Sequence, residues 1–135
     1  MKLEELLKTP MIGESELATY WRVDADTIYA ASKPSSRTVE TIASNVALVK
    51  SLNDQKPVKL IISIAKSSVP DKATRELAAK ELPVTYSAMA MIAPNKLTGF
   101  IINLIYGMKK PPIPMKTFSN FEDAYRWISR LDVTK

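Results

Sequence analysis

Residues 58–65, VKLIISIA, form a continuous run of mainly apolar and β-branched residues. Such a run is typical of a central strand that is covered on both faces, usually a strand with parallel neighbours. Periodic patterns typical of helices occur on both sides of it. Because alternation of strands and helices predicts a parallel sheet centre with helices packed against it, the run predicts a layered α/β domain.

The rest of the chain supplies the other elements of this domain. Residues 17–23 alternate in polarity and lead through Asp24-Ala25-Asp26 into TIYAAS, which predicts a β-hairpin. Apolar side chains at the 3.6-residue spacing predict a helix over 37–52, with Ser36 or Thr38 as its cap. The further predicted elements are a short helix at 2–8, a helix that begins at Asp71 and is stopped by Pro83, a strand at 84–92, a helix at 96–106, a strand at 113–118 and a closing helix behind a Ser119–Glu122 capping box.

This order predicts a mixed sheet of four to five strands with a parallel centre, an N-terminal β-hairpin, and helices packed on the sheet. We divide the chain into an N-terminal helix and loop, residues 1–16, and a single α/β domain, residues 17–135. Residues 11–15 are expected to be a loop. A chain of 135 residues of which 46% are hydrophobic can build one core.

The proline-rich stretch KKPPIP is interpreted as part of the same domain. Prolines cannot donate to a strand ladder, so they indicate an entry loop and an edge strand. Pro111 and Pro114 formally match the Pro-x-x-Pro spacing of a docking peptide, which is the alternative. A loop that is anchored at both ends is poorly available to such a partner.

Composition argues against an enzyme. The chain has no histidine and no cysteine, so the commonest general acid–base residue, the thiolate nucleophile and the commonest zinc ligands are missing. Ser63 and Lys66 match a Ser-x-x-Lys pattern, but in acyl-transfer enzymes that serine begins a helix, whereas Ser63 falls in a predicted strand. We therefore predict no catalytic residues, no cofactor and no metal site.

The N-terminus, the length of the apolar stretches and the absence of cysteine predict a cytoplasmic protein without an integral membrane segment. The N-terminus, MKLEELLK, has two glutamates where a signal peptide needs an apolar run. The longest apolar stretch, LTGFIINLIYGM, has 12 residues, whereas a membrane-spanning helix needs about 20. The absence of cysteine suits a reducing compartment.

Charge is concentrated in residues 82–121, which contain four lysines and no acidic residue, so this segment carries +4 of the net charge of +5. In the predicted helix 96–106, Ile102 and Tyr106 fall on the face opposite the core-facing residues, beside Lys96, Lys109 and Lys110. This arrangement favours a contact surface for a second copy, an acidic protein or an anionic membrane, with a homodimer as the leading hypothesis. A scattered surface pair or a more deeply buried helix is the alternative. Nucleic-acid binding is not expected, because no arginine or aromatic platform accompanies the lysines.

Lys66, Ser67 and Ser68 follow the central strand. Open α/β sheets tend to bind ligands at the carboxyl ends of their strands, and hydroxyls, a lysine and a helix N-terminus suit an anion. The residues are therefore candidates for anion binding. The alternative is a polar loop whose serines cap the next helix.

The chain resembles the small single-domain proteins with a SpoIIAA-like (STAS-like) fold, many of them uncharacterised bacterial proteins. The resemblance covers roughly residues 17–132 and rests on TYWRVDADTIYA, on VKLIISIA followed by DKATRELAA, and on GMKKPPIPMKTFSNFEDAYRWI. It implies a four- or five-stranded mixed sheet. The broader superfamily includes anti-anti-sigma factors and cytoplasmic domains of anion transporters, and the lipid-binding CRAL-TRIO domains are similar in topology.

The resemblance also bears on regulation. Anti-anti-sigma factors are phosphorylated in an Asp-Ser-Ser-Gly motif at the start of the helix after the central strand. That motif falls here on Asp71, Lys72, Ala73 and Thr74, so the phosphate acceptor is absent and no phosphorylation is expected at Ala73. The sequence thus favours a non-enzymatic interaction or regulatory module that self-associates, with a small anion- or lipid-binding protein as the alternative.

Overall fold

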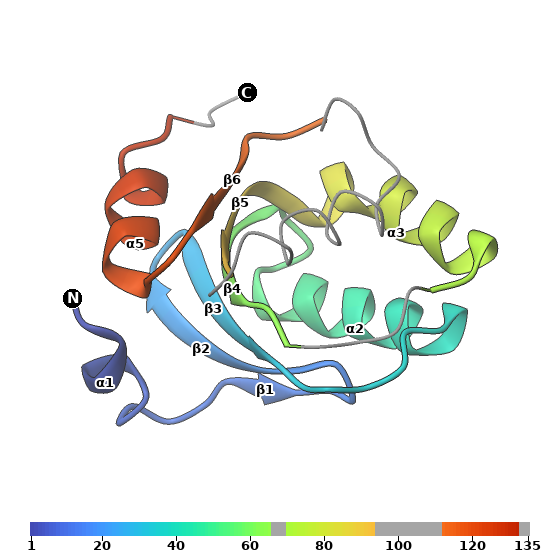
Figure 1. Ribbon diagram of the computed structural model, residues 1–135, viewed down its shortest axis with the longest axis horizontal. Coiled ribbons are helices and arrows are strands. Elements are labelled where there is room, and N and C mark those ends of the chain that lie inside the picture. The colour runs from blue at the N-terminus through green and yellow to red at the C-terminus, as the bar shows by residue number, and fades with distance from the viewer. Residues whose placement is uncertain (66–69, 94–111, 133–135) are drawn as a thin grey trace.

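The computed structural model describes residues 1–65, 70–93 and 112–132, and a six-stranded mixed sheet lies at its centre (Figure 1). The strands follow chain order across the sheet: β1 (Gly13–Glu14), β2 (Ala18–Asp24), β3 (Thr27–Ser32), β4 (Val58–Ser63), β5 (Tyr86–Ile92) and β6 (Met115–Phe118). β1, β2 and β3 pair in antiparallel fashion, whereas β3 to β6 are parallel. The predicted mixed sheet with a parallel centre and an N-terminal hairpin is confirmed.

β4 is the central strand that the sequence predicts. It pairs in parallel with β3 on one side and β5 on the other, and Ile61 lies opposite Tyr29 and Ala90. Residues 58–61 are all buried. A strand with helices over both faces has no solvent-facing side, which explains why its sequence is a continuous apolar run and not an alternating one.

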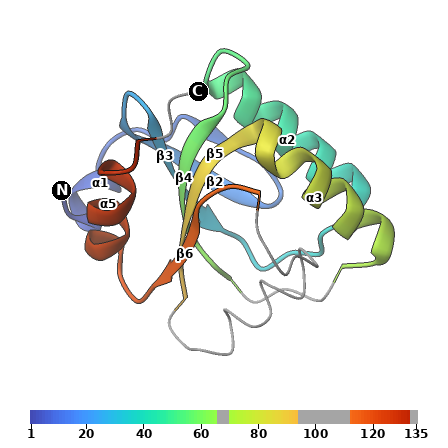
Figure 2. The same cartoon turned by 90° about the horizontal axis from the view of Figure 1, so that it is seen from above.

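Helices cover both faces of the sheet (Figures 1 and 2). α2 (Val39–Leu52) and α3 (Lys72–Thr85) lie side by side on one face, and α1 (Leu3–Leu6) and α5 (Phe121–Ser129) lie on the other. Alternate strand residues point to opposite faces. Ile28, Leu60 and Met89 accordingly belong to the core under α2 and α3, whereas their neighbours Tyr29, Ile61 and Ala90 belong to the core under α5.

The predicted strand count was too low, because residues 11–15 are not simply a loop. Gly13 and Glu14 form β1, in register with Tyr20 and Thr19 of β2. Ile12 extends the pairing, since its backbone amide donates to the Tyr20 carbonyl at 2.8 Å. Two residues are too few for an alternating pattern, so only the backbone pairing reveals this strand.

Pro83 does not end α3, which continues to Thr85. Proline lacks an amide hydrogen and so removes one hydrogen bond of the last turn. The backbone amide of Tyr86 nevertheless donates to the Leu82 carbonyl, and this bond carries the turn past the proline. The next strand therefore begins at Tyr86 and not at residue 84.

The predicted capping box of the closing helix was displaced by one residue. The N-cap of α5 is Asn120, whose Oδ1 accepts from the Asp123 amide at 2.9 Å. Glu122 does not reach back to the cap, and its Oε2 instead accepts from the backbone amide of Leu3 at 3.3 Å. The predicted core face is confirmed, since Phe121, Ala124 and Ile128 are buried.

We expect Asn120→Ala to lower the free energy of unfolding by about 1 kcal/mol, because the first turn of α5 loses its capping acceptor. Ser119→Ala is the matched control and should change it by less than about 0.5 kcal/mol, the usual range for an exposed position. Urea denaturation followed by circular dichroism measures both values. Equal losses in the two variants would contradict the assignment of Asn120 as the cap.

Candidate functional site

Most of the predicted site residues lie outside the described residues. This applies to the anion candidates Lys66, Ser67 and Ser68 and to the interface candidates Lys96, Ile102, Tyr106, Lys109 and Lys110. The anion-binding loop, the helix 96–106 and the homodimer therefore stay predictions. Among the described residues, no helix is long and apolar enough to cross a membrane.

Two residues that the sequence singled out are described and have structural roles. Ser63 Oγ of β4 is hydrogen-bonded to Tyr29 OH of the neighbouring strand β3 at 2.6 Å. Burial raises the pKa of Tyr29, and the hydrogen bond to Ser63 opposes that rise. Asp71 is the N-cap of α3, where its Oδ1 accepts from the Thr74 amide at 2.8 Å. Ala73, the position on which the phosphorylated serine of the anti-anti-sigma motif falls, is exposed and has no hydroxyl.

A cavity of about 60 Å³ lies between the sheet and helices α2 and α3; we call it the α2–α3 cavity. The sheet contributes Leu60, Ile62 and Met89 to its wall, and the helices contribute Ile42, Val46 and Leu82, among other residues. Most of this wall is core surface, because Leu60, Met89 and Leu82 are each 2% exposed. The cavity therefore offers a mainly apolar environment close to the middle of the fold.

Several polar groups interrupt the apolar wall. They are Tyr20, Ser32, Arg37, Asn45, Glu81, Thr85 and Tyr86. Within the described part of the chain, Ser32 Oγ and Thr85 Oγ1 are shielded from solvent and have no hydrogen-bond partner. An unsatisfied buried hydroxyl costs about 1–3 kcal/mol, and such groups are normally paired with protein, water or ligand. Both hydroxyls can therefore bind a polar group, a water or part of a ligand, in this cavity.

The charges on the cavity wall balance. Among the described residues, Glu81 and Arg37 are the charged groups of the lining, and they have opposite signs. The carboxylate of Glu81 also forms an ion pair at 3.1 Å with Lys50, which does not line the cavity. Charge on the wall therefore selects neither an anion nor a cation.

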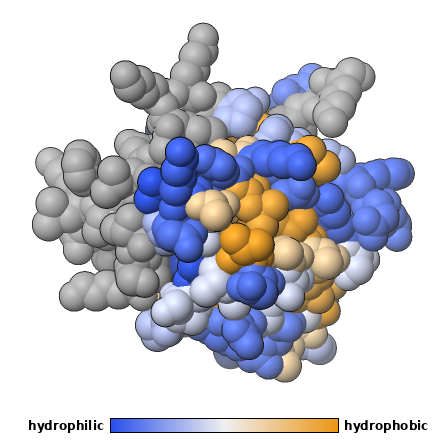
Figure 3. Space-filling model, turned by 90° about the vertical axis from the view of Figure 1, so that its right-hand side faces the viewer, coloured by the Kyte–Doolittle hydropathy of each residue, from blue (hydrophilic) through white to orange (hydrophobic). Residues whose placement is uncertain are grey.

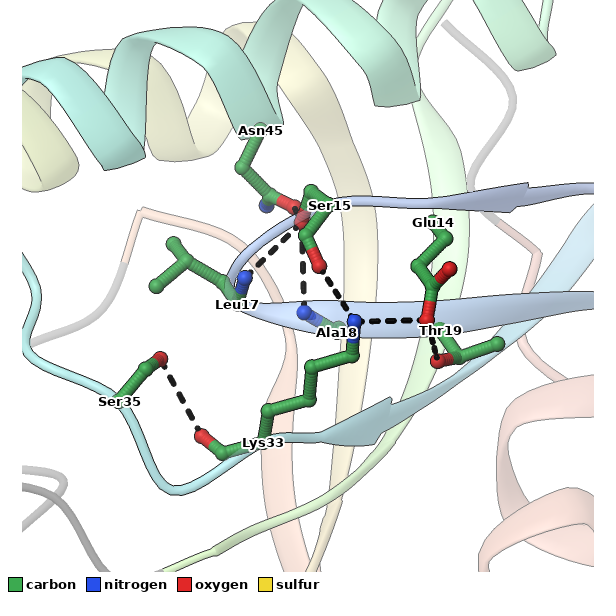
Figure 4. A network of polar contacts seen from close by, with 8 residues as sticks. All are labelled: Glu14, Ser15, Leu17, Ala18, Thr19, Lys33, Ser35 and Asn45. Carbon is green, nitrogen blue, oxygen red and sulfur yellow. Dashed lines mark hydrogen bonds and ion pairs between the residues drawn. The ribbon is translucent and has the colours of Figure 1, made fainter.

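Asn45 connects the cavity wall to the turn between β1 and β2. Its Oδ1 accepts from Tyr20 OH and from Ser15 Oγ, both at 2.7 Å. Ser15 Oγ in turn accepts from the backbone amides of Leu17 and Ala18 (Figure 4). These bonds fix Asn45 and Tyr20, so the polar side of the cavity is held in place before any ligand arrives.

An ion pair fixes the outer side of the same turn. Lys33 Nζ donates to Glu14 Oε2 at 2.7 Å and to the Ser15 carbonyl at 2.9 Å (Figure 4). The hydrogen bond and the charge of Lys33 lower the pKa of Glu14. The turn is therefore tied to the end of β3 as well as to α2.

An apolar surface borders the cavity. Figure 3 shows apolar residues gathered in one patch, with polar residues around it, on the side of the molecule formed by α2 and α3. The exposed and half-buried apolar residues of α2 include Val39, Ile42, Ala43, Val46 and Ala47. Ile42 and Val46 also line the cavity. A ligand with an apolar part would thus meet apolar surface inside the cavity and next to it.

The cavity was not predicted from the sequence. Its residues come from β2, β3, α2, β4, α3 and β5 and from the segments between them, so no short motif contains them. One signal was available. Asn45 is three residues after Ile42 and four before Val49, so it is a polar residue on the apolar face of its helix.

A family model described as "Domain of unknown function (DUF7793)" matches residues 21–132. The chain belongs to this family. The DUF7793 match contains every strand from β3 to β6 and most of the cavity wall, whereas α1 and β1 precede it. No curated protein matches the chain in sequence.

One solved structure is similar to the DUF7793 chain over most of its length. It is an uncharacterised protein of the DUF3478 family with a SpoIIAA-like fold, from Shewanella loihica PV-4. The TM-score is 0.58 at 16% identity, over 90% of this chain and 97% of that chain. The similarity confirms the predicted SpoIIAA-like fold and says nothing about activity.

Proposed function

We propose that this protein is a non-enzymatic regulatory module that binds a small ligand in the α2–α3 cavity. The observation that best supports the proposal is the pair of buried hydroxyls, Ser32 Oγ and Thr85 Oγ1, which have no partner among the described residues and belong to a mainly apolar wall. Ligand sites are mostly apolar, with a few placed polar groups that fix orientation. The α2–α3 cavity has this composition.

The size of the cavity limits the ligand. An engineered cavity of about 150 Å³ binds benzene, and this one has about 60 Å³. It therefore accepts a group of a few heavy atoms and not a lipid chain. Of the two alternatives that the sequence leaves, a small anion fits this size and a lipid does not. Hydroxyls both donate and accept, so a carbonyl, carboxylate or hydroxyl attached to a short alkyl group suits the wall best.

Ordered water is the competing occupant. A water needs at least about 10–15 Å³ and two to four polar partners. Ser32, Thr85 and the polar network around Asn45 could supply them. Water and ligand differ in one respect that can be measured: only a ligand gives a saturable, concentration-dependent stabilisation.

The other parts of the proposal have support from composition. A chain without histidine or cysteine lacks the side chains most used for catalysis near neutral pH, which favours a binding role over an enzymatic one. The same lack of cysteine favours the cytoplasm. Self-association through the segment that contains Ile102 and Tyr106 is proposed on the sequence pattern alone.

Thermal shift with three four-carbon probes tests the ligand site. Butyrate, butyramide and n-butanol present an anion, an amide and a hydroxyl on similar alkyl chains. We expect at least one of them to raise the melting temperature of the wild type in a saturable way. Thr85→Val removes Thr85 Oγ1 from the cavity at nearly constant side-chain volume. The affinity for that probe should fall about 3- to 10-fold, which corresponds to the loss of one hydrogen bond.

Thr27→Val is the matched control. Thr27 Oγ1 is also buried without a partner in the described part of the chain, but Thr27 is two residues before Tyr29 in β3 and therefore lies on the α5 face. Both valine variants should be more stable than the wild type without ligand, since each loses an unsatisfied polar group. Only Thr85→Val should lose affinity for the probe.

Two results would refute the proposal. One is the absence of a saturable shift with all three probes, together with a native mass spectrum at the mass of the bare chain for protein purified from cells. The other is an equal loss of probe affinity in both valine variants, which would place the binding elsewhere.

A further inference from the structure

A buried lysine lies in the central strand. Lys59 is the second residue of β4, between Val58 and Leu60, and its neighbours across the sheet are Thr27 and Ala88. Lys59 is only 7% exposed. Lysine is almost never fully buried unless its charge is paired, so this position calls for an explanation.

The described residues supply only part of what a buried ammonium needs. Lys59 Nζ donates to the Leu131 carbonyl at 2.9 Å, just after the end of α5. None of the ion pairs in the described part of the chain involves Lys59. An ammonium has three donors, so after the bond to Leu131 two donors are left for water or for a ligand.

The ammonium faces a groove that could hold the missing anion. A groove of about 600 Å³ is lined by Lys59 together with Lys56 and Arg130, both of which are exposed. Ser87 and Ser129 add hydroxyls to its wall. A volume of this size falls within the range of about 300–1,000 Å³ that is usual for small-molecule sites.

The charges of the groove narrow the class of ligand. Three cations are opposed by two carboxylates, those of Asp26 and Asp132. The excess of one positive charge favours an anion. Carboxylates accept hydrogen bonds but repel anions, so a ligand that carries hydroxyl groups beside its anionic group fits both kinds of side chain.

We propose that this groove, which is separate from the α2–α3 cavity, binds the phosphate group of a small hydroxylated molecule, with Lys59 as the buried cation. Lysine binds phosphate as a point charge, and arginine adds planar donors. Ser87 donates a further hydrogen bond to a phosphate oxygen, whereas Ser129 Oγ donates to the Arg126 carbonyl at 3.3 Å and contributes only to the polar wall. Inorganic phosphate presents the same anionic chemistry without the hydroxylated part.

The competing explanation is a purely structural role, in which Lys59 holds the end of α5. A cation near a helix C-terminus is favourable by itself. Loss of stability on mutation of Lys59 would fit both explanations. The test must therefore measure binding and must include variants of the exposed residues, which do not touch the core.

A titration monitored by amide chemical shifts separates phosphate binding from a purely structural role of Lys59. Isotope-labelled protein is titrated with inorganic phosphate and with glycerol 3-phosphate. We expect saturable shifts for groove residues such as Ser87 and Arg130, with glycerol 3-phosphate binding more tightly. Lys56→Ala and Arg130→Ala should each weaken binding about tenfold, which corresponds to about 1.4 kcal/mol. Lys59→Met should abolish it.

Lys72→Met is the matched control, because it removes one positive charge from a side chain that is 84% exposed and does not line the groove. It should leave the affinity unchanged. The proposal is wrong if neither ligand gives saturable shifts, if Lys72→Met weakens binding as much as Lys56→Ala, or if a folded Lys59→Met protein binds like the wild type. If Lys59→Met does not fold, the two alanine variants decide the question.

Discussion

Ile61→Ala is expected to lower the free energy of unfolding by about 2–5 kcal/mol, the range for truncating a buried isoleucine. Ile61 is 0% exposed and lies in the middle of β4, with parallel strands on both sides. Its side chain belongs to the core under α5 together with Phe121 and Ile128. Because these elements surround it, the cavity left by alanine cannot easily collapse. Urea denaturation followed by tryptophan fluorescence measures the change.

Val39→Ala provides the comparison for Ile61. Val39 is 40% exposed at the start of α2, so its truncation should change stability by no more than about 0.5 kcal/mol. A loss of less than about 1 kcal/mol for Ile61→Ala would be far below the range for a buried site. Such a result would mean that residues 58–63 do not form the centre of the sheet.

Leu6→Ala is the second substitution with a large expected effect, and it should lower the free energy of unfolding by about 2–5 kcal/mol. α1 has only four residues, and a helix that short is not stable alone in water. Leu6 is 1% exposed and belongs to the same core as Val23 and Tyr29. Its burial, with the bond from the Leu3 amide to Glu122, is what holds α1 on the domain.

The neighbouring residue supplies the control for α1. Leu7 is 45% exposed, so Leu7→Ala should be nearly neutral, within about 0.5 kcal/mol. Denaturation curves for the two variants should differ clearly in midpoint. Coincident curves would show that α1 is not docked through Leu6. The comparison is informative because α1 precedes the part of the chain that matches the family model.

The sequence predicted best those elements whose pattern is local. The run 58–65 became β4, TIYAAS became β3, and the apolar spacing of the closing helix located its buried face on Phe121, Ala124 and Ile128. In β3 and β4 the first four residues are all buried, whereas in α5 the buried residues recur at the helical spacing. A pattern of this kind depends little on what packs against it.

The errors occur where tertiary geometry decides. β1 forms because the backbone of its two residues pairs with β2. The cap of α5 moved from Ser119 to Asn120 because the chain enters the helix one residue later. The α2–α3 cavity gathers residues from position 17 to position 89, and no local pattern reports that they meet.

Lys59 shows a different kind of omission. It lies inside VKLIISIA, a run whose apolar character predicts only a strand. A lysine within a strand that is covered on both faces must be buried, where its ammonium needs a partner, or must extend its ammonium to water at the rim. The conflict between a charged residue and a buried strand was therefore the best available signal for the groove.

The two outermost strands of the sheet make poor templates for another chain. β1 is two residues long, and β6 is four residues long, contains the exposed Lys116 and follows Pro112 and Pro114. Short strands, charges and prolines at such positions hinder the addition of foreign strands. The fold thus resists edge-to-edge aggregation, and copies of this chain that associate should do so through side-chain surfaces rather than by extending the sheet.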